Sequence, residues 1–333
     1  MDDVLLLKRI AEEYRNTASL AVLKDGRLVY EKYFDGLCPD DKLHVFSVTK
    51  SVVALLVGIA IDHGFITGVR QKVLDFFPDY VPKRGEKTLQ QVTLHDVLSM
   101  TVPYKYRSAP YTKYFGSPDW VKTSLDLMGG KGTIGEFRYA PLIGPDVLSG
   151  ILVKATGMSV LDFAMKYLFG PLGITIDGSV VFHSKEEQMA WYRNRTSHGW
   201  VSDPCGVHTA GWGLSLSPRD MVKIGSLCLD GGRDIVSADW IAQCTTEQSR
   251  WKERNLPYGY LWWPLETDGA YAALGDGGNT IYVNPKARMV VAFTCRFDPR
   301  AKNRIGLIEE AILPSGCGRN KVEDEQPSVY VRS

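Results

Sequence analysis

The sequence predicts an α+β fold: an antiparallel sheet built from both chain ends, flanked by terminal helices, with a mainly helical insertion. Strand-like runs lie near the two ends of the chain, helical patterns fill the middle, and tight turns join neighbouring strand-like runs. Parallel strands would need crossover helices between them, so we expect these strands to pair antiparallel.

The N-terminal part predicts a helix, a hairpin and a second helix. Residues 2–15 carry a stripe of apolar side chains at helical spacing. The segment ASLAVLKDGRLVYEKYF then holds two strand-like runs around Asp25-Gly26. Asp-Gly favours a tight hairpin because both central residues of the turn take a positive φ. A strongly apolar helix is expected from Phe46 to Ile61.

The remaining elements follow from similar patterns. Helical spacing recurs in LHDVLSM, VLSGILVKATG and VLDFAMKYLFG, separated by loops rich in Gly, Pro, Tyr and Lys. A short strand follows at about residue 210, and Ser217-Pro218 opens another helix. The tail predicts strands at 269–274, 279–284 and 289–295 and a helix at 300–313, with a frayed polar end from Pro314.

Length and element order together predict two domains. A chain of 333 residues corresponds to roughly two domains. We expect a discontinuous sheet domain of residues 1–65 plus 205–333 and a mainly helical domain of residues 66–204. A functional site would then lie in the cleft between them.

Composition excludes several classes of protein. With 44% hydrophobic and 23% charged residues the chain is that of a globular protein, not a disordered one. The 39 basic and 38 acidic residues give a formal charge of +1, so neither nucleic acid nor a membrane is expected as partner. The longest apolar run, Val52 to Ile61, is too short to cross a bilayer, and the acidic N-terminus lacks signal-peptide features. We therefore expect a cytoplasmic location; the oligomeric state stays open.

Cysteine and histidine spacing predicts no metal site. No two of the six cysteines form a C-x-x-C pair, and thiols stay reduced in the cytosol, so a disulfide framework is not expected. Cys205 and His208 are three residues apart, but no second pair accompanies them. We expect neither a metal nor an organic cofactor.

The segment Ser47-Val48-Thr49-Lys50 is an S-x-x-K motif at the start of the apolar helix. Its spacing places Lys50 on the same helix face as Ser47, one turn away. A lysine can take the proton of a serine hydroxyl if burial lowers its pKa far below about 10.4. The alternative is a helix-capping serine followed by a partly exposed lysine. A second match, Ser249 to Lys252, lies in a polar stretch that is typical of a surface.

A longer resemblance extends this motif. FSVTKSVVALLVGIAIDHGFI resembles the active-site helix of the serine β-lactamase and penicillin-binding-protein superfamily, in particular its class C-like branch of esterases, peptidases and amide hydrolases. Further segments match in family order over roughly residues 18–296: VLDFFPDYVP, VTLHDVLSMT, GEFRYAPLIGPDVLSGILVKATGMSVLDFAMKYLFGPLGI, TAGWGLSLSPRDMVKIGSLCLDGG, YGYLWW and GDGGNTIYVNPKARMVVAF.

The resemblance implies a β-lactamase/transpeptidase-like fold and assigns roles to individual residues. Ser47 would be the nucleophile, Lys50 its partner base, and Tyr139 the tyrosine that passes the serine proton to the leaving group. Whether Lys50 or Tyr139 is the resting base stays open. Tyr104 and Tyr106 are the alternatives for the tyrosine role, but we expect them to line the pocket.

The third element of the family, K-T-G in many relatives, aligns with Asp276, Gly277 and Gly278. The resemblance implies that the backbone N–H of Asn279 is the second oxyanion donor beside that of Ser47. Close packing of backbone against a neighbour is the alternative explanation for the glycine pair.

Two departures from the family pattern bear on the substrate. Pro141 replaces the asparagine of the Y-x-N element, and Asp276 stands where lysine or histidine is frequent. We expect Asp276 to point along the cleft, away from Lys50, and to repel substrates that carry a carboxylate.

The sequence thus predicts a serine hydrolase that cleaves a small-molecule ester or amide through an acyl-enzyme and is a poor β-lactamase. The alternative is a catalytically weakened ligand-binding or regulatory module on the same fold.

Overall fold

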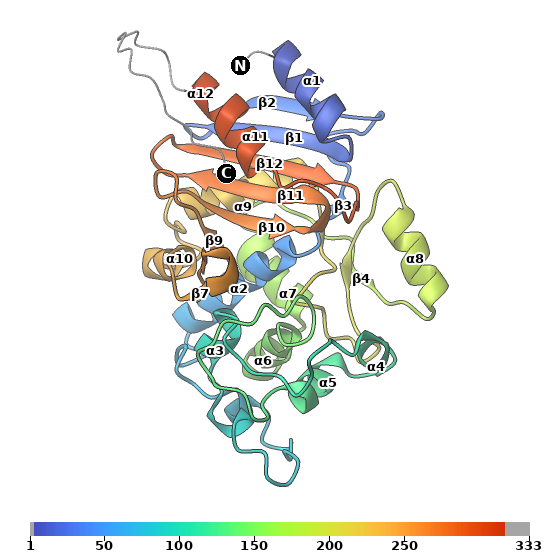
Figure 1. Cartoon of the computed structure of the whole chain (residues 1–333), viewed down its shortest axis with the longest axis vertical. Helices are drawn as coiled ribbons and strands as arrows, with labels where there is room; N and C mark the ends of the chain where they lie inside the picture. Colours follow the sequence, from blue (N-terminus) through green and yellow to red (C-terminus); the bar gives the residue numbers. More distant parts are fainter. Residues whose placement is uncertain (1–2, 317–333) are drawn as a thin grey trace.

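A six-stranded antiparallel sheet forms one half of the protein, whose structure, a computed structural model, describes residues 3–316 (Figure 1). The strand order is β2-β1-β12-β11-β10-β9, so strands from the two chain ends meet at the β1–β12 pair, where Ala21 lies opposite Ala292. This confirms the predicted sheet. Its strands are β1 (Thr17–Lys24), β2 (Arg27–Tyr33), β9 (Trp263–Pro264), β10 (Tyr271–Gly275), β11 (Asn279–Asn284) and β12 (Met289–Cys295).

The β1–β2 turn has the geometry that its sequence favours. Asp25 and Gly26 have φ values of 49° and 75°, and Lys24 pairs with Arg27 across the turn. Positive φ at both central residues matches the right-handed twist of the two strands. The Asp-Gly pair therefore fixes the register of this hairpin.

Helices cover both faces of the sheet. The terminal helices lie on one face, where Leu6, Ile10, Leu307 and Ile312 share a buried cluster with sheet residues (Figure 1). On the other face, Gly225 lets a helix approach closely, because a Cβ there would lie 2.4 Å from the Val290 side chain. These helices are α1 (Asp3–Glu13), α9 (Pro218–Leu229), α11 (Ile305–Leu307), the π-helical turn η6 (Ile308–Ile312) and α12 (Leu313–Gly316).

The C-terminal helix is shifted relative to the prediction. It begins at Ile305 instead of residue 300. At this start, the Asn303 side chain accepts a hydrogen bond from Ile305 N at 3.1 Å. It continues past residue 313 to Gly316. Most of the segment predicted to fray, including Cys317, lies outside the described residues; the other five cysteines are free.

The helical insertion forms the other half (Figure 1). The three predicted helical patterns are found at α3, α6 and α7 with η3. Its elements are η1 (Val73–Phe76), η2 (Leu89–Gln91), α3 (Leu94–Leu98), α4 (Tyr111–Phe115), α5 (Trp120–Leu127), α6 (Asp146–Thr156), α7 (Val160–Ala164), η3 (Met165–Phe169), β4 (Ser179–Val180), α8 (Lys185–Arg193) and β5 (Trp200–Val201).

The helix α2 (Val48–Asp62) lies where the two halves meet. Every residue from Val48 to Ala60 is buried, and the largest core cluster continues from the sheet through α2 into α6. Because this core is shared, the domain boundaries at 65/66 and 204/205 stay a prediction. The remaining elements around α2 are β3 (Leu43–His44), β6 (Ser215–Leu216), α10 (Ala238–Thr245), β7 (Ser249–Trp251), η4 (Lys252–Arg254), β8 (Leu256–Tyr258) and η5 (Asp276–Gly278).

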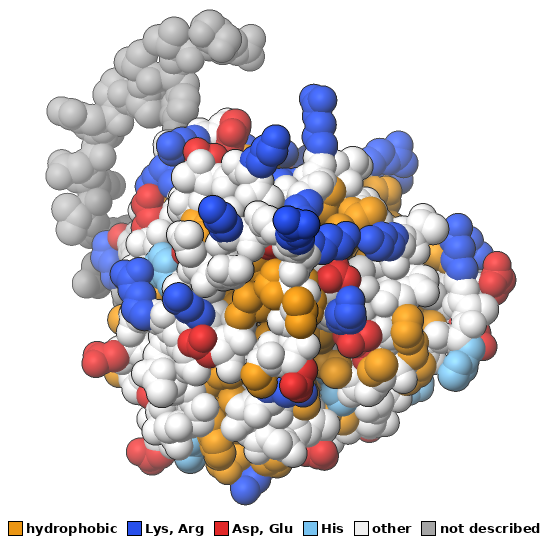
Figure 2. Space-filling view, turned by 90° about the horizontal axis from the view of Figure 1, so that it is seen from below, with side chains coloured by type: hydrophobic (Ala, Val, Ile, Leu, Met, Phe, Trp, Pro, Cys, Tyr) orange, Lys and Arg blue, Asp and Glu red, His pale blue; other side chains and the backbone are white. Residues whose placement is uncertain are grey.

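The surface carries charges of both signs. Seen from below, basic, acidic and apolar side chains are interspersed (Figure 2). Within residues 3–316, no single helix is long and apolar enough to span a membrane; only the bent pair Asp146–Thr156 with Val160–Phe169 reaches that length and composition together.

Candidate active site

Ser47 stands immediately before α2. The preceding residue, Phe46, has a φ of 50°, which is unusual for a bulky side chain and turns the chain sharply into the helix. The Ser47 side chain makes no capping hydrogen bond to the helix backbone. Instead, Lys50 Nζ donates to Ser47 Oγ at 2.7 Å. Ser47 therefore does not act as an ordinary side-chain cap.

Lys50 is a buried amine with two hydrogen-bond acceptors. Its exposed fraction is 1%, and Nζ also donates to the carbonyl oxygen of Gly211 at 2.6 Å. Burial lowers the pKa of Lys50 to about 7, while the negative charges of Asp276 and Asp146 oppose this shift. An amine with this pKa is substantially neutral near pH 7, and its lone pair can then accept the Ser47 proton.

Gly211 reaches Lys50 because it has no side chain. A Cβ at Gly211 would lie 2.8 Å from the carbonyl oxygen of Pro141 and 3.1 Å from Leu142 Cα. The backbone of 141–142 thus packs directly on Gly211. Pro141 occupies the position where the family resemblance leads one to expect an asparagine, and in this chain a backbone carbonyl holds the lysine.

Tyr139 completes a group of three interacting side chains. Its hydroxyl is hydrogen-bonded to Ser47, which lowers the pKa of Tyr139, but burial outweighs this and raises the pKa to about 12. Lys50 Nζ lies 5.7 Å from the centre of the Tyr139 ring. Trp251 stacks against that ring at 6.2 Å, and Trp263 packs on it at 5.9 Å. The structure therefore brings the predicted Ser47, Lys50 and Tyr139 together.

The end of β10 comes close to the backbone of Ser47. A Cβ at Gly275 would lie 3.2 Å from Ser47 N and 2.3 Å from the carbonyl oxygen of Val45. Asn279 lies opposite Gly275 on the next strand, β11, and is fully buried. Its amide donates to the Asp276 carbonyl at 2.7 Å, so its side chain holds the turn together. Sequence analysis did not single out Gly275.

Gly277 and Gly278 form the turn between β10 and β11. Their φ values are 79° and 92°, a region that glycine adopts without strain. A Cβ at Gly277 would lie 2.7 Å from the Arg296 carbonyl, and one at Gly278 would lie 2.8 Å from the Arg304 guanidinium. Close packing, the alternative explanation for this glycine pair, accounts for both positions.

Asp276 acts electrostatically on four groups. Its negative charge raises the pKa of Lys50, Tyr139, Tyr111 and Tyr192, which belong to different parts of the chain. These four groups therefore lie within electrostatic range of Asp276. The pKa of Lys50 is nevertheless low, because burial outweighs the carboxylate. That Asp276 points along the cleft, away from Lys50, stays a prediction.

Tyr104 lies beside this group and does not contact Ser47. Its ring packs against Tyr106 at 5.2 Å and under the Arg138 guanidinium at 5.3 Å. It lines a surface depression of about 660 Å³ together with Lys131 and other residues. Ser47, Lys50 and Tyr139 are not among the residues that line this depression.

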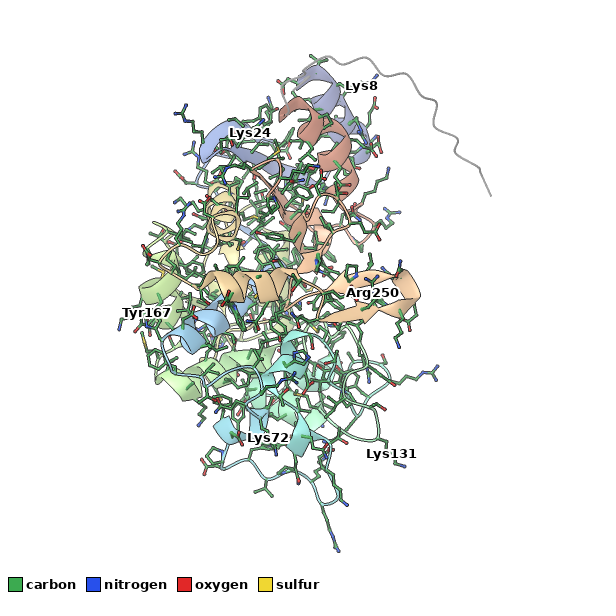
Figure 3. The ribbon with its side chains drawn as sticks, turned by 90° about the vertical axis from the view of Figure 1, so that its left-hand side faces the viewer. Lys8, Lys24, Lys72, Lys131, Tyr167 and Arg250 are labelled. Carbon is green, nitrogen blue, oxygen red and sulfur yellow. The ribbon has the colours of Figure 1, made fainter. Side chains whose placement is uncertain are left out.

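The competing sequence motifs do not form sites. Ser249, on β7, donates its hydroxyl hydrogen to the Ser99 carbonyl at 2.6 Å. Its neighbour Arg250 lies about halfway along the molecule (Figure 3). Cys205 is exposed, and His208 pairs with the Ser179 hydroxyl at 2.8 Å. In the part of the chain that the structure describes, no three His, Cys, Asp or Glu side chains are grouped as metal ligands.

Sequence analysis missed three residues near Lys50 or Ser47, namely Asp146, Gly211 and Gly275, and it missed Tyr114, which donates its hydroxyl hydrogen to Asp146. The two glycines lie within or next to segments that resemble the family, but nothing in their spacing marked them. Asp146 begins an apolar helix, where an acidic residue is common because of the helix dipole. Their roles become visible only from contacts between segments that are far apart in the sequence. A local sequence pattern carries no information on such contacts.

The chain is similar to several known proteins. The chain is 24% identical over 330 residues to 6-aminohexanoate-dimer hydrolase from Paenarthrobacter ureafaciens, covering 89% of this chain and 77% of that protein. The octameric penicillin-binding protein homologue from Pyrococcus abyssi superposes with a TM-score of 0.72 at 21% identity, over 95% of this chain and 78% of that one. EstCE1, a hydrolase with promiscuous acyltransferase activity, gives a TM-score of 0.71 at 16% identity, over 95% and 97%.

These structural likenesses show the β-lactamase/transpeptidase-like fold. A sequence model of the Beta-lactamase family matches residues 6–312, nearly the whole chain. The match includes the α2 helix, the segment with Tyr139 and the β10–β11 turn. The chain therefore belongs to the Beta-lactamase family and is a serine hydrolase.

Proposed function

We propose that this hydrolase cleaves small neutral or amine-bearing esters and amides through an acyl-enzyme on Ser47. The observation that carries the proposal is the buried Lys50 amine 2.7 Å from Ser47 Oγ, with a pKa lowered to about 7. A serine hydroxyl becomes a strong nucleophile when an adjacent base takes its proton. Here burial alone is enough to make much of the Lys50 amine neutral near pH 7.

The proposed reaction has two halves. Ser47 Oγ attacks the carbonyl carbon while its proton passes to Lys50. Tyr139 then gives its proton to the leaving alcohol or amine and takes the proton that Lys50 holds, so both groups return to their resting state. Water then attacks the acyl-enzyme, and its proton returns through the same groups as Ser47 leaves. The pKa values of about 7 for Lys50 and about 12 for Tyr139 support Lys50 as the resting base. Backbone N–H groups at Ser47 and at the end of β10 near Gly275 are the candidate oxyanion donors.

The charge of Asp276 supports the substrate class. A substrate carboxylate about 4 Å from an ionised aspartate would lose about 1 to 4 kcal/mol, depending on solvation. That corresponds to roughly one to three decades in specificity. Penicillins and cephalosporins carry such a carboxylate, whereas an amine would be attracted. The Paenarthrobacter relative is named for hydrolysis of an aminohexanoate dimer, and EstCE1 as a hydrolase with acyltransferase activity; both names fit amide or ester substrates.

Covalent labelling tests the nucleophile. A fluorophosphonate or an activated ester should add one label to the protein, located at Ser47 by peptide mass, and Ser47→Ala should lose both label and turnover while remaining folded. Labelling of Ser249, or of no residue in the folded protein, would remove the proposal. Labelling of Ser47 without turnover of any ester or amide would favour the ligand-binding alternative.

A matched substrate pair tests the charge argument. One neutral and one anionic chromogenic ester with the same leaving group are compared on the wild type and on Asp276→Asn. We expect the wild type to prefer the neutral ester and Asp276→Asn to reduce that preference by about tenfold or more. A wild type that prefers the anionic ester, or a preference unchanged by Asp276→Asn, contradicts the argument.

A further inference from the structure

A buried carboxylate lies behind the Lys50 amine. Asp146, the first residue of α6, is 2% exposed. Its Oδ1 accepts hydrogen bonds from Ala210 N at 2.7 Å and from Gly211 N at 3.0 Å. Its Oδ2 accepts the hydroxyl hydrogen of Tyr114, which is also buried. The three groups that donate hydrogen bonds to this carboxylate thus all lie outside its own helix, α6.

These bonds connect Asp146 to Lys50 through one residue. Gly211 gives its N–H to Asp146 and takes the Lys50 Nζ hydrogen on its carbonyl oxygen. An acid at a helix start normally caps its own helix, but no side chain caps α6, whose N-cap is Pro145. The carboxylate therefore fixes the orientation of the 210–211 backbone instead.

The charge of Asp146 also acts on Lys50. Burial raises the pKa of Asp146 to about 6, while Tyr114, the two backbone amides and Lys50 act to lower it. The carboxylate is therefore mostly ionised at pH 7. Lys50 is faced by two carboxylates, Asp146 and Asp276, and by the Ser47 and Tyr139 hydroxyl-bearing side chains. Asp203 and Tyr192 also act electrostatically on Tyr114 and raise its pKa.

We propose that Asp146, held by Tyr114, is a positioning residue that fixes the Gly211 carbonyl on Lys50 and stabilises the positive charge that Lys50 acquires from Ser47. The inference rests on the proposed function, in which Lys50 accepts the Ser47 proton. It adds a buried acid that does not touch the substrate but sets both the place and the basicity of the amine. In this proposal Asp146 forms no bond to the substrate, and it neither gains nor loses a proton during the reaction.

The test separates the charge of Asp146 from its shape. The rate of Ser47 labelling by a neutral fluorophosphonate is measured against pH for the wild type, Asp146→Asn and Asp146→Ala. In the wild type we expect the rate to rise through a midpoint near pH 7 as Lys50 becomes neutral. Asp146→Asn keeps the Oδ1 acceptor and loses the charge, so its plateau rate stays near wild type while its midpoint falls by on the order of one pH unit.

Asp146→Ala loses the acceptor as well, so its plateau rate should fall by about tenfold or more because the Gly211 carbonyl is no longer held. Ser149→Ala is the matched control: Ser149 is buried on the same helix, and its hydroxyl has no partner within the described chain. Its labelling profile should equal that of the wild type. Rescue of the plateau by Asn, with the midpoint still shifted, distinguishes a positioning role from a merely structural one.

Two results overturn the inference. An Asp146→Asn midpoint equal to that of the wild type would show that Asp146 does not set the basicity of Lys50. If Asp146→Asn fails to fold, Tyr114→Phe replaces it: removing the phenol raises the pKa of Asp146, so the midpoint should fall by a smaller amount, and an unchanged midpoint refutes the inference. A wild type that is not labelled at Ser47 removes the proposed function itself, and this inference with it.

Discussion

Replacing Lys50 by methionine should abolish activity and yet stabilise the protein near pH 7. The difference between the ordinary lysine pKa of 10.5 and the value of about 7 in the fold corresponds to a cost of about 5 kcal/mol for burying the amine at or below pH 7. Methionine fills a similar space without a charge. It leaves the Ser47 and Gly211 oxygens without this donor, which costs about 1 to 3 kcal/mol for each. The net gain in unfolding free energy is therefore up to about 3 kcal/mol.

The pH dependence of this gain is the sharper test. Between about pH 7 and 10.5 the unfolded chain holds a proton on Lys50 that the folded chain has released, so wild-type stability rises with pH relative to Lys50→Met. The slope approaches about 1.4 kcal/mol per pH unit, and the advantage of the variant should shrink by about 2 kcal/mol from pH 7 to pH 9. Below about pH 6 both states hold the proton, and the difference becomes constant.

Urea unfolding of both proteins between about pH 6 and pH 9 measures this difference directly. Ser47→Ala serves as the control, because it alters the same hydrogen bond but keeps the Lys50 amine; the pH slope relative to Lys50→Met should persist in it. Parallel stability curves for the wild type and Lys50→Met would refute the reasoning, since they would mean that the folded state does not depress the pKa of Lys50.

Further substitutions test the surrounding contacts. Tyr139→Phe should lower turnover by about a hundredfold while keeping the stacking on Trp251, and Tyr104→Phe should be nearly silent in the same steady-state assay; the reverse pattern would reassign the proton carrier. Gly211→Ala should lower the unfolding free energy by about 1 to 3 kcal/mol, measured by urea unfolding, because its Cβ meets the backbone of 141–142. Gly306→Ala, where a Cβ would meet nothing closer than 3.8 Å, should not destabilise; equal losses in both variants would contradict the close-approach argument.

Local patterns predicted much of this molecule because their physical causes are local. The Asp25-Gly26 turn depends on the φ preferences of two residues, and the structure has positive φ at both. The relation of Ser47 to Lys50 depends on one helical turn, so a spacing of three residues was enough to predict that the two side chains meet. The C-terminal helix boundary was less well predicted, because apolar spacing does not locate a side-chain contact such as that of Asn303 with the Ile305 N–H.

The parts that escaped prediction depend on contacts across the chain. One such contact is the close approach of Gly275, at the end of β10, to the backbone N of Ser47, which no local pattern marked. Alignment to a motif counts residues but does not locate the turn. Asp146 was likewise inconspicuous, because its partners Ala210 and Gly211 are more than sixty residues away in the sequence.

The departure at Pro141 bears on whether the site is weakened. A proline there removes a side-chain amide, yet Lys50 retains two oxygen acceptors, one of them the Gly211 carbonyl that packs on the 141–142 backbone. A carbonyl and a hydroxyl do not oppose the positive charge that Lys50 gains, and the carboxylates of Asp146 and Asp276 favour it. Burial alone would depress the pKa further, and a base acts best when its pKa is near the working pH. The two acids therefore keep the pKa of the amine near 7, an arrangement that a site used only for binding would not require.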